Sequence, residues 1–322
     1  MKQLAKEIIN GRRLGREDDL SIFLTANIDD LCLGADMIRK NLCGDEAELC
    51  SIINGRSGRC SEDCKFCAQS CHYVTEAESY AFRRLEEIVK ETRKNEEIGI
   101  RRFSIVTAGR SLDGEDLKKA LNVYAYLHRE SNMELCASHG LVTEDVFRQL
   151  KAVGVTRYHS NIETSRRYFP HVCTTHTYDD KIANIQRAQR AGLEVCSGGI
   201  IGMGEQWEDR IDMAISLAEL GIASIPLNIL RPIHGTPFEM QPPISNEDIL
   251  RTVAIFRYIN PTAQIRIAAG RDQFGDGGRV LFRSGANAAI SGDMLTTIGS
   301  TMTDDVTMLL QLGYKLQKGE NK

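Results

Sequence analysis

Short apolar runs that alternate with charge-rich, helix-like stretches constrain the fold of this chain more than any other feature. Strands that alternate with helices indicate βαβ units and a parallel sheet. Eight such runs fit one (β/α)8 barrel of the TIM type over residues 46–322, with an N-terminal helical extension over residues 1–45. A doubly wound open sheet is the alternative fold. The expected strands are Glu48–Asn54, Arg102–Ala108, Glu134–His139, Arg157–Glu163, Glu194–Ile201, Ser224–Leu230, Gln264–Ala269 and Ala288–Ser291, and the helices between them include Arg84–Ile98, Glu115–Glu130, Thr143–Ala152, Asp179–Ala191, Trp207–Leu220 and Asn246–Ile259.

The composition excludes several classes of function. The 322 residues carry 40 basic and 44 acidic side chains, and a net charge of -4 provides no basic field for nucleic acid. No apolar stretch approaches the ~20 residues of a membrane span. The first 20 residues are charged and helix-patterned, and Asp18, Asp19, Asp29 and Asp30 argue against a presequence. We therefore expect a cytoplasmic globular protein that binds neither nucleic acid nor membrane.

Residues with ligand-forming side chains recur at alternate positions of the expected strands. Alternate residues of a strand point to the same face. The residues that share this parity are Ser104, Val106, Ala108, Cys136, Ser138, His159, Asn161, Glu163, Cys196, Gly198, Gln264, Arg266 and Ala268, most of them polar. The opposite parity is apolar and suits packing against helices, with Phe103, Ile105, Tyr158, Ile162, Ile265 and Ile267. Since branched apolar residues normally fill a barrel, a polar lumen indicates an active site.

Cys60, Cys64 and Cys67 follow the first expected strand with the spacing Cys-x3-Cys-x2-Cys. Ten cysteines in 322 residues are too few for a disulfide scaffold, and such a cluster in a cytosolic chain indicates metal binding. Three thiolates can hold three irons of a 4Fe-4S cluster and leave the fourth iron open. The alternative is a structural zinc site that Cys71 or His72 completes.

This spacing, in this place, resembles the radical S-adenosylmethionine (SAM) superfamily. From Leu49 to Thr297 the chain is similar to the biotin synthase family. The stretches that carry the similarity are SGRCSEDCKFCAQSCHY, NIETS, TTHTYDDKI, EVCSGGIIGMGE, IPLNIL, IRIAAGR and GDMLTT. The cysteine spacing alone is typical of the superfamily, whereas the ordered set is specific to the family.

The resemblance implies that Cys60, Cys64 and Cys67 hold a 4Fe-4S cluster whose open iron chelates SAM. One electron then cleaves SAM to methionine and a 5′-deoxyadenosyl radical. The SAM-binding positions of the family match Phe66 against adenine, Asn161 and Glu163 at the ribose, and a glycine segment from Gly198 to Gly202 beside adenine. The family commonly has Asp where this chain has Glu163. Those glycines also suit a bulge or a tight turn.

An auxiliary iron–sulfur cluster, the sulfur donor of the family, is implied by Cys136, Cys196 and Arg266. An inward guanidinium requires an anion, which a cluster or a substrate carboxylate provides. The fourth family position is Cys, but this chain has Ser104. Ser104 can ligate through oxygen, a poor match for iron–sulfur chemistry, or Cys71 can provide the thiolate, or the cluster is larger than the usual 2Fe-2S. For Cys32, Cys43, Cys50 and Cys173 we expect packing roles.

The family function is sulfur insertion that converts dethiobiotin to biotin. Asn228 matches a position that hydrogen-bonds the ureido ring, and Thr296 with Thr297 matches the carboxylate site. A small electron donor such as flavodoxin or ferredoxin and a homodimer are also implied. The alternatives are another radical SAM barrel enzyme of the hydrogenase-maturase or pyrrolysine-pathway type, without sulfur transfer, and a non-catalytic zinc or iron–sulfur protein.

Overall fold

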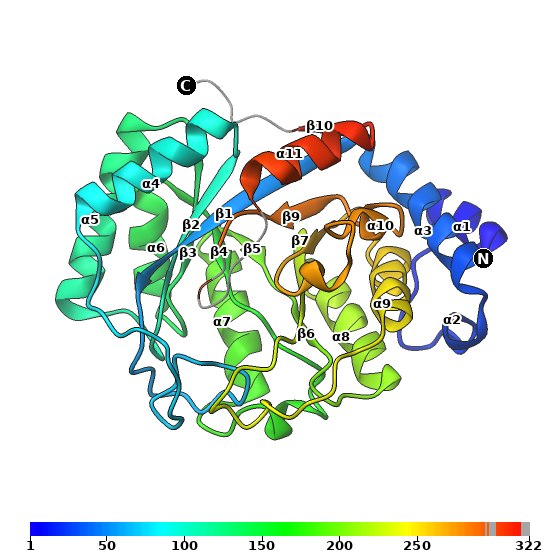
Figure 1. Cartoon of the computed structure of the whole chain (residues 1–322), viewed down its shortest axis with the longest axis horizontal. Helices are drawn as coiled ribbons and strands as arrows, with labels where there is room; N and C mark the ends of the chain where they lie inside the picture. Colours follow the sequence, from blue (N-terminus) through cyan, green and yellow to red (C-terminus); the bar gives the residue numbers. More distant parts are fainter. Residues whose placement is uncertain (294, 296–300, 317–322) are drawn as a thin grey trace.

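A closed parallel barrel forms the body of the molecule in the computed structural model, which describes residues 1–293, 295 and 301–316 (Figure 1). Around the barrel the strand order is β1, β2, β3, β4, β5, β7, β8 and β9, and β9 pairs again with β1. The described strands are β1 (Glu46–Arg56), β2 (Arg102–Thr107), β3 (Glu134–Ser138), β4 (Val155–His159), β5 (Glu194–Cys196), β6 (Gly199–Ile201), β7 (Ser224–Ile229), β8 (Gln264–Ile267), β9 (Ala288–Ile290) and β10 (Lys315–Leu316). The closure confirms the (β/α)8 prediction and excludes the open sheet.

Helices connect the strands and surround the barrel (Figure 1). Within the described residues they are α1 (Lys2–Ile9), α2 (Ile22–Thr25), α3 (Ile28–Cys43), α4 (Leu85–Ile98), α5 (Gly114–Glu130), α6 (Glu144–Ala152), α7 (Tyr178–Arg190), α8 (Trp207–Glu219), α9 (Asn246–Ile259), α10 (Arg279–Phe282) and α11 (Met302–Gln311). Short 3-10 turns lie at Phe169–His171 and Arg271–Gln273. Thr143, Thr177, Ser245 and Thr301 cap the N-termini of α6, α7, α9 and α11, because each side chain accepts a backbone N–H of the first turn.

Several predicted strands end one or two residues earlier than expected, and the two largest differences lie beside the candidate site. The strand predicted over 194–201 is divided into β5 and β6, because the N–H of Gly198 donates to Asn161 Oδ1 at 3.0 Å instead of to a strand. The strand predicted over 157–163 ends at His159, and Glu163 has the positive φ of 67°. A non-glycine residue in this left-handed region is uncommon and gathers at functional sites.

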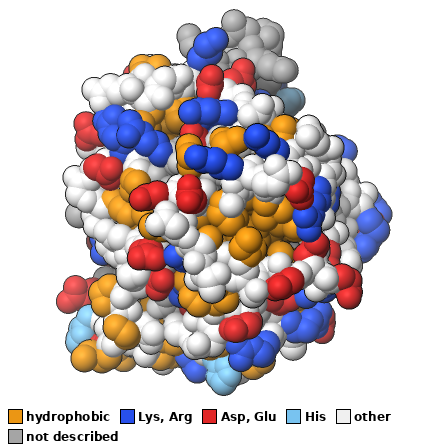
Figure 2. Space-filling view, turned by 90° about the vertical axis from the view of Figure 1, so that its right-hand side faces the viewer, with side chains coloured by type: hydrophobic (Ala, Val, Ile, Leu, Met, Phe, Trp, Pro, Cys, Tyr) orange, Lys and Arg blue, Asp and Glu red, His pale blue; other side chains and the backbone are white. Residues whose placement is uncertain are grey.

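The fully described segment 1–45 contains α1, α2 and α3, and the proposed boundary at residue 45 falls between α3 and β1. These helices lie beside α9 at one side of the barrel (Figure 1). Arg251 of α9 donates to the carbonyls of Phe23 and Ala26 at 2.8 and 2.9 Å and so holds the turn after α2. Figure 2 shows this side of the molecule, where basic and acidic side chains are interspersed around hydrophobic ones. Among the described residues, none of the helices has the length and apolar character needed to cross a membrane.

The apolar parity of the strands packs outward, as the sequence predicts. Phe103, Ile105, Tyr158 and Ile265 are fully buried in the main core between strands and helices. Burial of each such side chain contributes about 1.5–3 kcal/mol to folding. The opposite parity is therefore directed into the barrel.

Candidate active site

A cavity of about 320 Å³ lies inside the barrel. Its wall consists of inward side chains of the strands and of the loop that carries the three clustered cysteines, among them Phe66, Cys67, Ser104, Cys136, Asn161, Glu163, Cys196, Asn228, Arg266 and Cys50. The structure thus brings together most of the residues that the sequence places in the lumen.

Strand register arranges the inward side chains in layers of four from alternate strands, as in other barrels of this type. The strands are tilted relative to the barrel axis. A layer therefore continues on the second strand along, two residues after the position that pairing across the intervening strand reaches. Cys50 of β1 lies opposite Arg102 of β2, and Arg102 lies opposite Glu134 of β3, two residues before Cys136. The same step leads from Cys136 to Cys196 of β5, then to Arg266 of β8, and then back to Cys50 of β1. These four residues therefore form one closed layer.

The layers on either side follow from the same pairings. Below the thiols lies a layer of Arg102, Arg157, Ser224 and Ala288, and below that one of Glu48, Glu134, Glu194 and Gln264. Above the thiols, toward the C-terminal ends of the strands, lies a layer of Ser104, His159, Pro226 and Ile290. Charge is thus ordered along the barrel axis as acidic, basic and thiol.

Each thiol in the layer has a polar partner. Arg266 Nη1 donates to Cys50 Sγ at 3.2 Å, and Arg102 Nη1 donates to Cys136 Sγ at 3.7 Å. Burial raises the pKa of Cys50 to about 12 and also raises the pKa of Cys136. Although burial opposes it, a hydrogen bond with His159 and the nearby cations lower the pKa of Cys196 to about 6. Cys50, for which we expected a packing role, is buried and lines the cavity beside these thiols.

Glu48 is the anion that Arg266 requires. Its carboxylate contacts Arg266 Nη2 and accepts from Arg157 Nη1 at 2.9 Å, and Arg102 Nε lies 3.6 Å away. Burial alone would raise the pKa of Glu48, but the three guanidinium groups hold it well below its ordinary value. Sequence reasoning missed this residue and assigned the anion to a cluster or a substrate.

The guanidinium groups at the floor of the cavity are paired with carboxylates of unequal burial. Arg102, Arg157 and Arg266 share one fully buried carboxylate, that of Glu48. Glu134 and Glu194 pair with two of these guanidinium groups, but Glu194 has a side chain that is 56% exposed. Arg102 and Arg266 also donate to the sulfur atoms of Cys136 and Cys50, so this floor suits negative charge at the thiol layer.

Ser104 and Cys71 differ sharply in their surroundings. The Ser104 hydroxyl is buried in the cavity wall and has no hydrogen-bond partner among the described residues. Cys71 is exposed and is not among the residues that line the cavity. The structure therefore places Ser104, and not Cys71, beside the thiol layer.

Asn161 and Glu163 face the upper part of the cavity. Asn161 Oδ1 accepts from the Gly198 N–H, which leaves its NH2 group for a ligand. Glu163 Oε2 is buried without a partner among the described residues, and Glu163 Oε1 lies 3.9 Å from Lys181 Nζ. An unpaired buried carboxylate oxygen fits a hydroxyl donor.

Close backbone packing explains the glycines of this segment. A Cβ on Gly198 would lie 1.9 Å from the Pro226 carbonyl oxygen, and one on Gly199 would lie 2.2 Å from the Glu163 carbonyl oxygen. Gly202 has a φ of 90°, and its N–H donates to Glu205 at 2.9 Å. These positions therefore need glycine for the fold itself, whether or not a ligand lies beside them.

Phe66 belongs to a small apolar cluster separate from the main core. The cluster comprises Val172, Ile200, Met203 and Leu230, with Phe66, Tyr168 and Phe238 packed against it. Ile200 and Leu230 also line the cavity. This arrangement provides an apolar wall of the kind that a flat aromatic base contacts.

The expected substrate residues are only partly described. Asn228 lines the cavity, donates to the Gly199 carbonyl at 3.2 Å and accepts from the Ala269 N–H at 3.3 Å. An amide has two donors and two acceptor lone pairs, so capacity for a ligand remains. Thr296 and Thr297 lie outside the described residues.

Contacts with residues 172–176 hold the cysteine loop. The Lys65 N–H donates to the Val172 carbonyl at 3.0 Å, and Asp63 Oδ1 accepts from the Thr174 N–H at 2.8 Å. Within the loop, the Cys67 N–H donates to the Cys64 carbonyl at 3.0 Å. All three clustered cysteines are partly exposed, and Cys67 lines the cavity.

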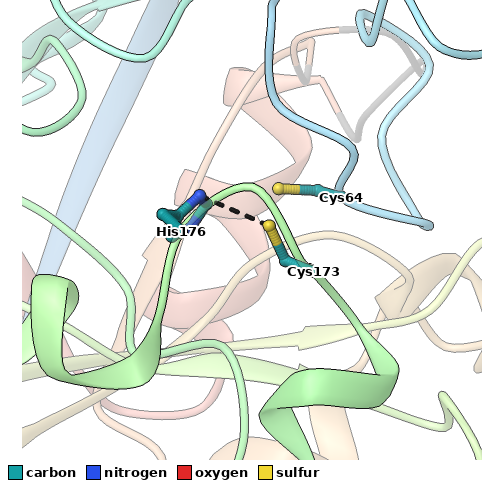
Figure 3. A group of neighbouring side chains, drawn as sticks. All are labelled: Cys64, Cys173 and His176. Atoms are coloured by element: carbon teal, nitrogen blue, oxygen red, sulfur yellow. Dashed lines mark hydrogen bonds between the residues drawn. The ribbon is translucent and has the colours of Figure 1, made fainter.

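Cys64 also lies beside Cys173, for which we expected a packing role, and His176 (Figure 3). One ligand atom from each of the three residues lies within 4.8 Å of the others. Cys173 Sγ is 3.3 Å from His176 Nδ1, and a hydrogen bond with Cys64 outweighs burial and lowers the pKa of Cys173 to about 4. The spacing suits a single ion, whereas the expected zinc partners Cys71 and His72 are both exposed.

Comparisons with known proteins agree with this geometry. Residues 56–218 match the Radical SAM superfamily, and residues 226–315 match the Biotin and Thiamin Synthesis associated domain. The chain is 60% identical to a biotin synthase of Clostridium beijerinckii over 98% of this chain and 100% of that one. It is 58% identical to a biotin synthase of Alkaliphilus metalliredigens, with 98% and 99% of the two chains covered.

Solved structures share the barrel at much lower identity. Methylornithine synthase (PylB) superposes with a TM-score of 0.83 at 21% identity, covering 98% of both chains. HydG, a maturase of the [FeFe]-hydrogenase, superposes with a TM-score of 0.81 at 17% identity over 98% of this chain and 76% of its own. At these identities the likeness concerns the fold alone.

Proposed function

Because the chain belongs to the biotin synthase family of the radical SAM superfamily, we propose that it converts dethiobiotin to biotin by inserting sulfur, with SAM as the second substrate. The observation that carries this function is one cavity that joins the cysteine loop above to a layer of three thiols and an arginine below. A radical SAM barrel that transfers no sulfur gives this thiol layer no role.

Cys60, Cys64 and Cys67 would hold the 4Fe-4S cluster. The three partly exposed thiols and the absence of a fourth cysteine from this spacing fit a cluster with one open iron. When bound, the cluster provides the electron that cleaves SAM, and the resulting 5′-deoxyadenosyl radical removes hydrogen from dethiobiotin. The protein itself holds the reactants in register and excludes water.

Asn161, Glu163 and Phe66 would orient SAM. The unpaired Glu163 oxygen would accept a ribose hydroxyl, and Asn161 would donate to the other. Phe66 and its apolar cluster would contact adenine, with the backbone of Gly198 to Gly202 close by. This orientation would bring the sulfonium near the cysteine loop.

Cys136, Cys196 and Arg266 would hold the auxiliary cluster, of the 2Fe-2S type or larger. The guanidinium groups of Arg102 and Arg266, which donate to thiols of this layer, and the unpartnered Ser104 hydroxyl fit an anionic, sulfide-bearing group. Ser104, at the fourth ligand position of the family, and Cys71, as its replacement, are the candidates for a further ligand. Asn228 would bind the ureido ring of dethiobiotin between the two clusters, and Thr296 with Thr297 would bind its carboxylate.

We also propose that a small electron donor such as flavodoxin or ferredoxin reduces the protein. The protein would act as a homodimer in the cytoplasm. All ten cysteines are free, and iron–sulfur ligands need the reduced thiols of a reducing compartment.

Product analysis tests the function. The protein is reconstituted anaerobically with iron and sulfide and mixed with SAM, reductant and dethiobiotin. We expect biotin and 5′-deoxyadenosine by mass spectrometry. Deoxyadenosine without biotin would retain the radical SAM assignment and overturn the substrate, and zinc at one per chain without sulfide would overturn both.

The Glu163 carboxylate gives a specific prediction for SAM binding. Glu163→Gln removes the charge and keeps the shape, so the dissociation constant of SAM should rise about 10- to 100-fold, as for loss of a charged hydrogen bond. Glu163→Asp, the usual family residue, should keep most of the affinity. Equilibrium dialysis of SAM with the reconstituted protein measures both, and unchanged binding by the Gln variant would contradict the assignment.

A further inference from the structure

We propose that Cys50 is a thiolate ligand of the auxiliary cluster and completes a set of three with Cys136 and Cys196. The inference rests on the proposed function, since it concerns the cluster that donates sulfur. It assigns to β1 the ligand that the family pattern places at position 104.

The barrel register is the first reason. Cys50, Cys136 and Cys196 come from β1, β3 and β5, and alternate strands contribute to one layer. Arg266 of β8 is the fourth member of the same layer. Their side chains are therefore at one height along the axis and line the same cavity, whereas Ser104 belongs to the layer above.

Burial and hydrogen bonding are the second reason. The three cysteines are 8%, 5% and 8% exposed, in the order 50, 136 and 196, so they share one environment. Arg266 is 1% exposed and is held by Glu48 while it donates to Cys50 Sγ at 3.2 Å. A guanidinium aimed at a sulfur atom stabilises the negative charge that a metal-bound thiolate carries.

The other candidates are weaker on chemical grounds. The Ser104 hydroxyl is a hard oxygen donor, and iron–sulfur clusters select soft thiolates. Cys71 is exposed and does not line the cavity, and Cys173 lies beside Cys64 and His176 at the cysteine loop. Among the residues that the structure describes in the cavity wall, Cys50 is the one further thiol at the level of Cys136 and Cys196.

Cluster content of matched variants tests the assignment. Wild type, Cys50→Ser, Ser104→Ala and Cys71→Ala are reconstituted anaerobically, and iron, sulfide and Mössbauer spectra are measured. We expect Cys50→Ser to lose the Mössbauer signal of the auxiliary cluster. Its iron and sulfide content should fall to that of one 4Fe-4S cluster. The Ser104 and Cys71 variants should keep the wild-type content. Formation of 5′-deoxyadenosine by Cys50→Ser should persist, because it needs the SAM cluster alone.

Survival of the Mössbauer signal of the auxiliary cluster in Cys50→Ser would overturn the assignment. So would a result in which Ser104→Ala or Cys71→Ala loses this signal and Cys50→Ser keeps it. Failure of the proposed function is distinct, since wild type itself would then lack a second cluster.

Alkylation of wild type by iodoacetamide avoids any folding defect. We expect Cys50 to be protected in the loaded protein as strongly as Cys136 and Cys196, and to react in the metal-free protein. Equal reaction of Cys50 in both forms, with the other two protected, would refute the proposal.

Discussion

Replacing Cys64 by alanine is expected to abolish the reductive cleavage of SAM, with the rate falling at least about 1,000-fold to background. Loss of one of three thiolates leaves an iron of the cluster without its protein ligand, and the chemistry belongs to the cluster. Anaerobic reconstitution followed by quantification of 5′-deoxyadenosine measures the effect. Iron content should fall in parallel.

Cys173→Ala is the matched control for this variant, because Cys173 lies against Cys64 without belonging to the Cys-x3-Cys-x2-Cys spacing. It should keep the cluster and most of the activity. The opposite pattern, with Cys173→Ala inactive and Cys64→Ala active, would contradict the assignment of the SAM cluster. Such a result would favour the single-ion group of Cys64, Cys173 and His176 (Figure 3).

Glu48→Gln is expected to destabilise the protein by about 3–5 kcal/mol, because removal of one partner leaves buried charge uncompensated. Glu48 is 1% exposed and its carboxylate is shared by Arg157 and Arg266. Urea unfolding of the anaerobically purified protein, followed by circular dichroism, measures the change. Glutamine has nearly the size of glutamate. The loss in the free energy of unfolding therefore reflects the missing charge and not a cavity.

Glu194→Gln is the control, since Glu194 belongs to the same acidic layer but is 56% exposed. Its ion pair with Arg157 should contribute less than about 1 kcal/mol. The pKa of Glu48 lies below its ordinary value of 4.5, so its contribution is complete above that pH and declines as the pH falls further. Wild type should therefore lose more stability than Glu48→Gln on acidification below about pH 4.5. Equal stability of the two proteins at neutral pH would contradict the role of Glu48.

The barrel and the direction of its side chains could be predicted because both depend on local periodicity. A strand has a period of two, so parity alone separates Cys136, Cys196 and Arg266 from Ile265 and Tyr158. The structure confirms this separation, with the first group in the cavity and the second in the core.

The height of each residue in the barrel could not be predicted, because it depends on strand register. Register is set by pairings between distant segments, such as Cys50 with Ile290. A signal was nonetheless present, since Cys50 shares parity with Glu48, and a charged residue within an apolar strand points to a polar lumen. The contact between Asp63 and Cys173 spans 110 residues, and no local pattern indicates it.

Sulfur tracing tests the central claim, that the thiol layer holds the donor of the sulfur atom. The protein is reconstituted with 34S-sulfide, freed of unbound sulfide, and allowed one turnover with SAM, reductant and dethiobiotin that contain natural sulfur. Mass spectrometry of the product should show biotin that carries the 34S label. Biotin without the label, in protein whose clusters are shown to be labelled, would contradict the claim.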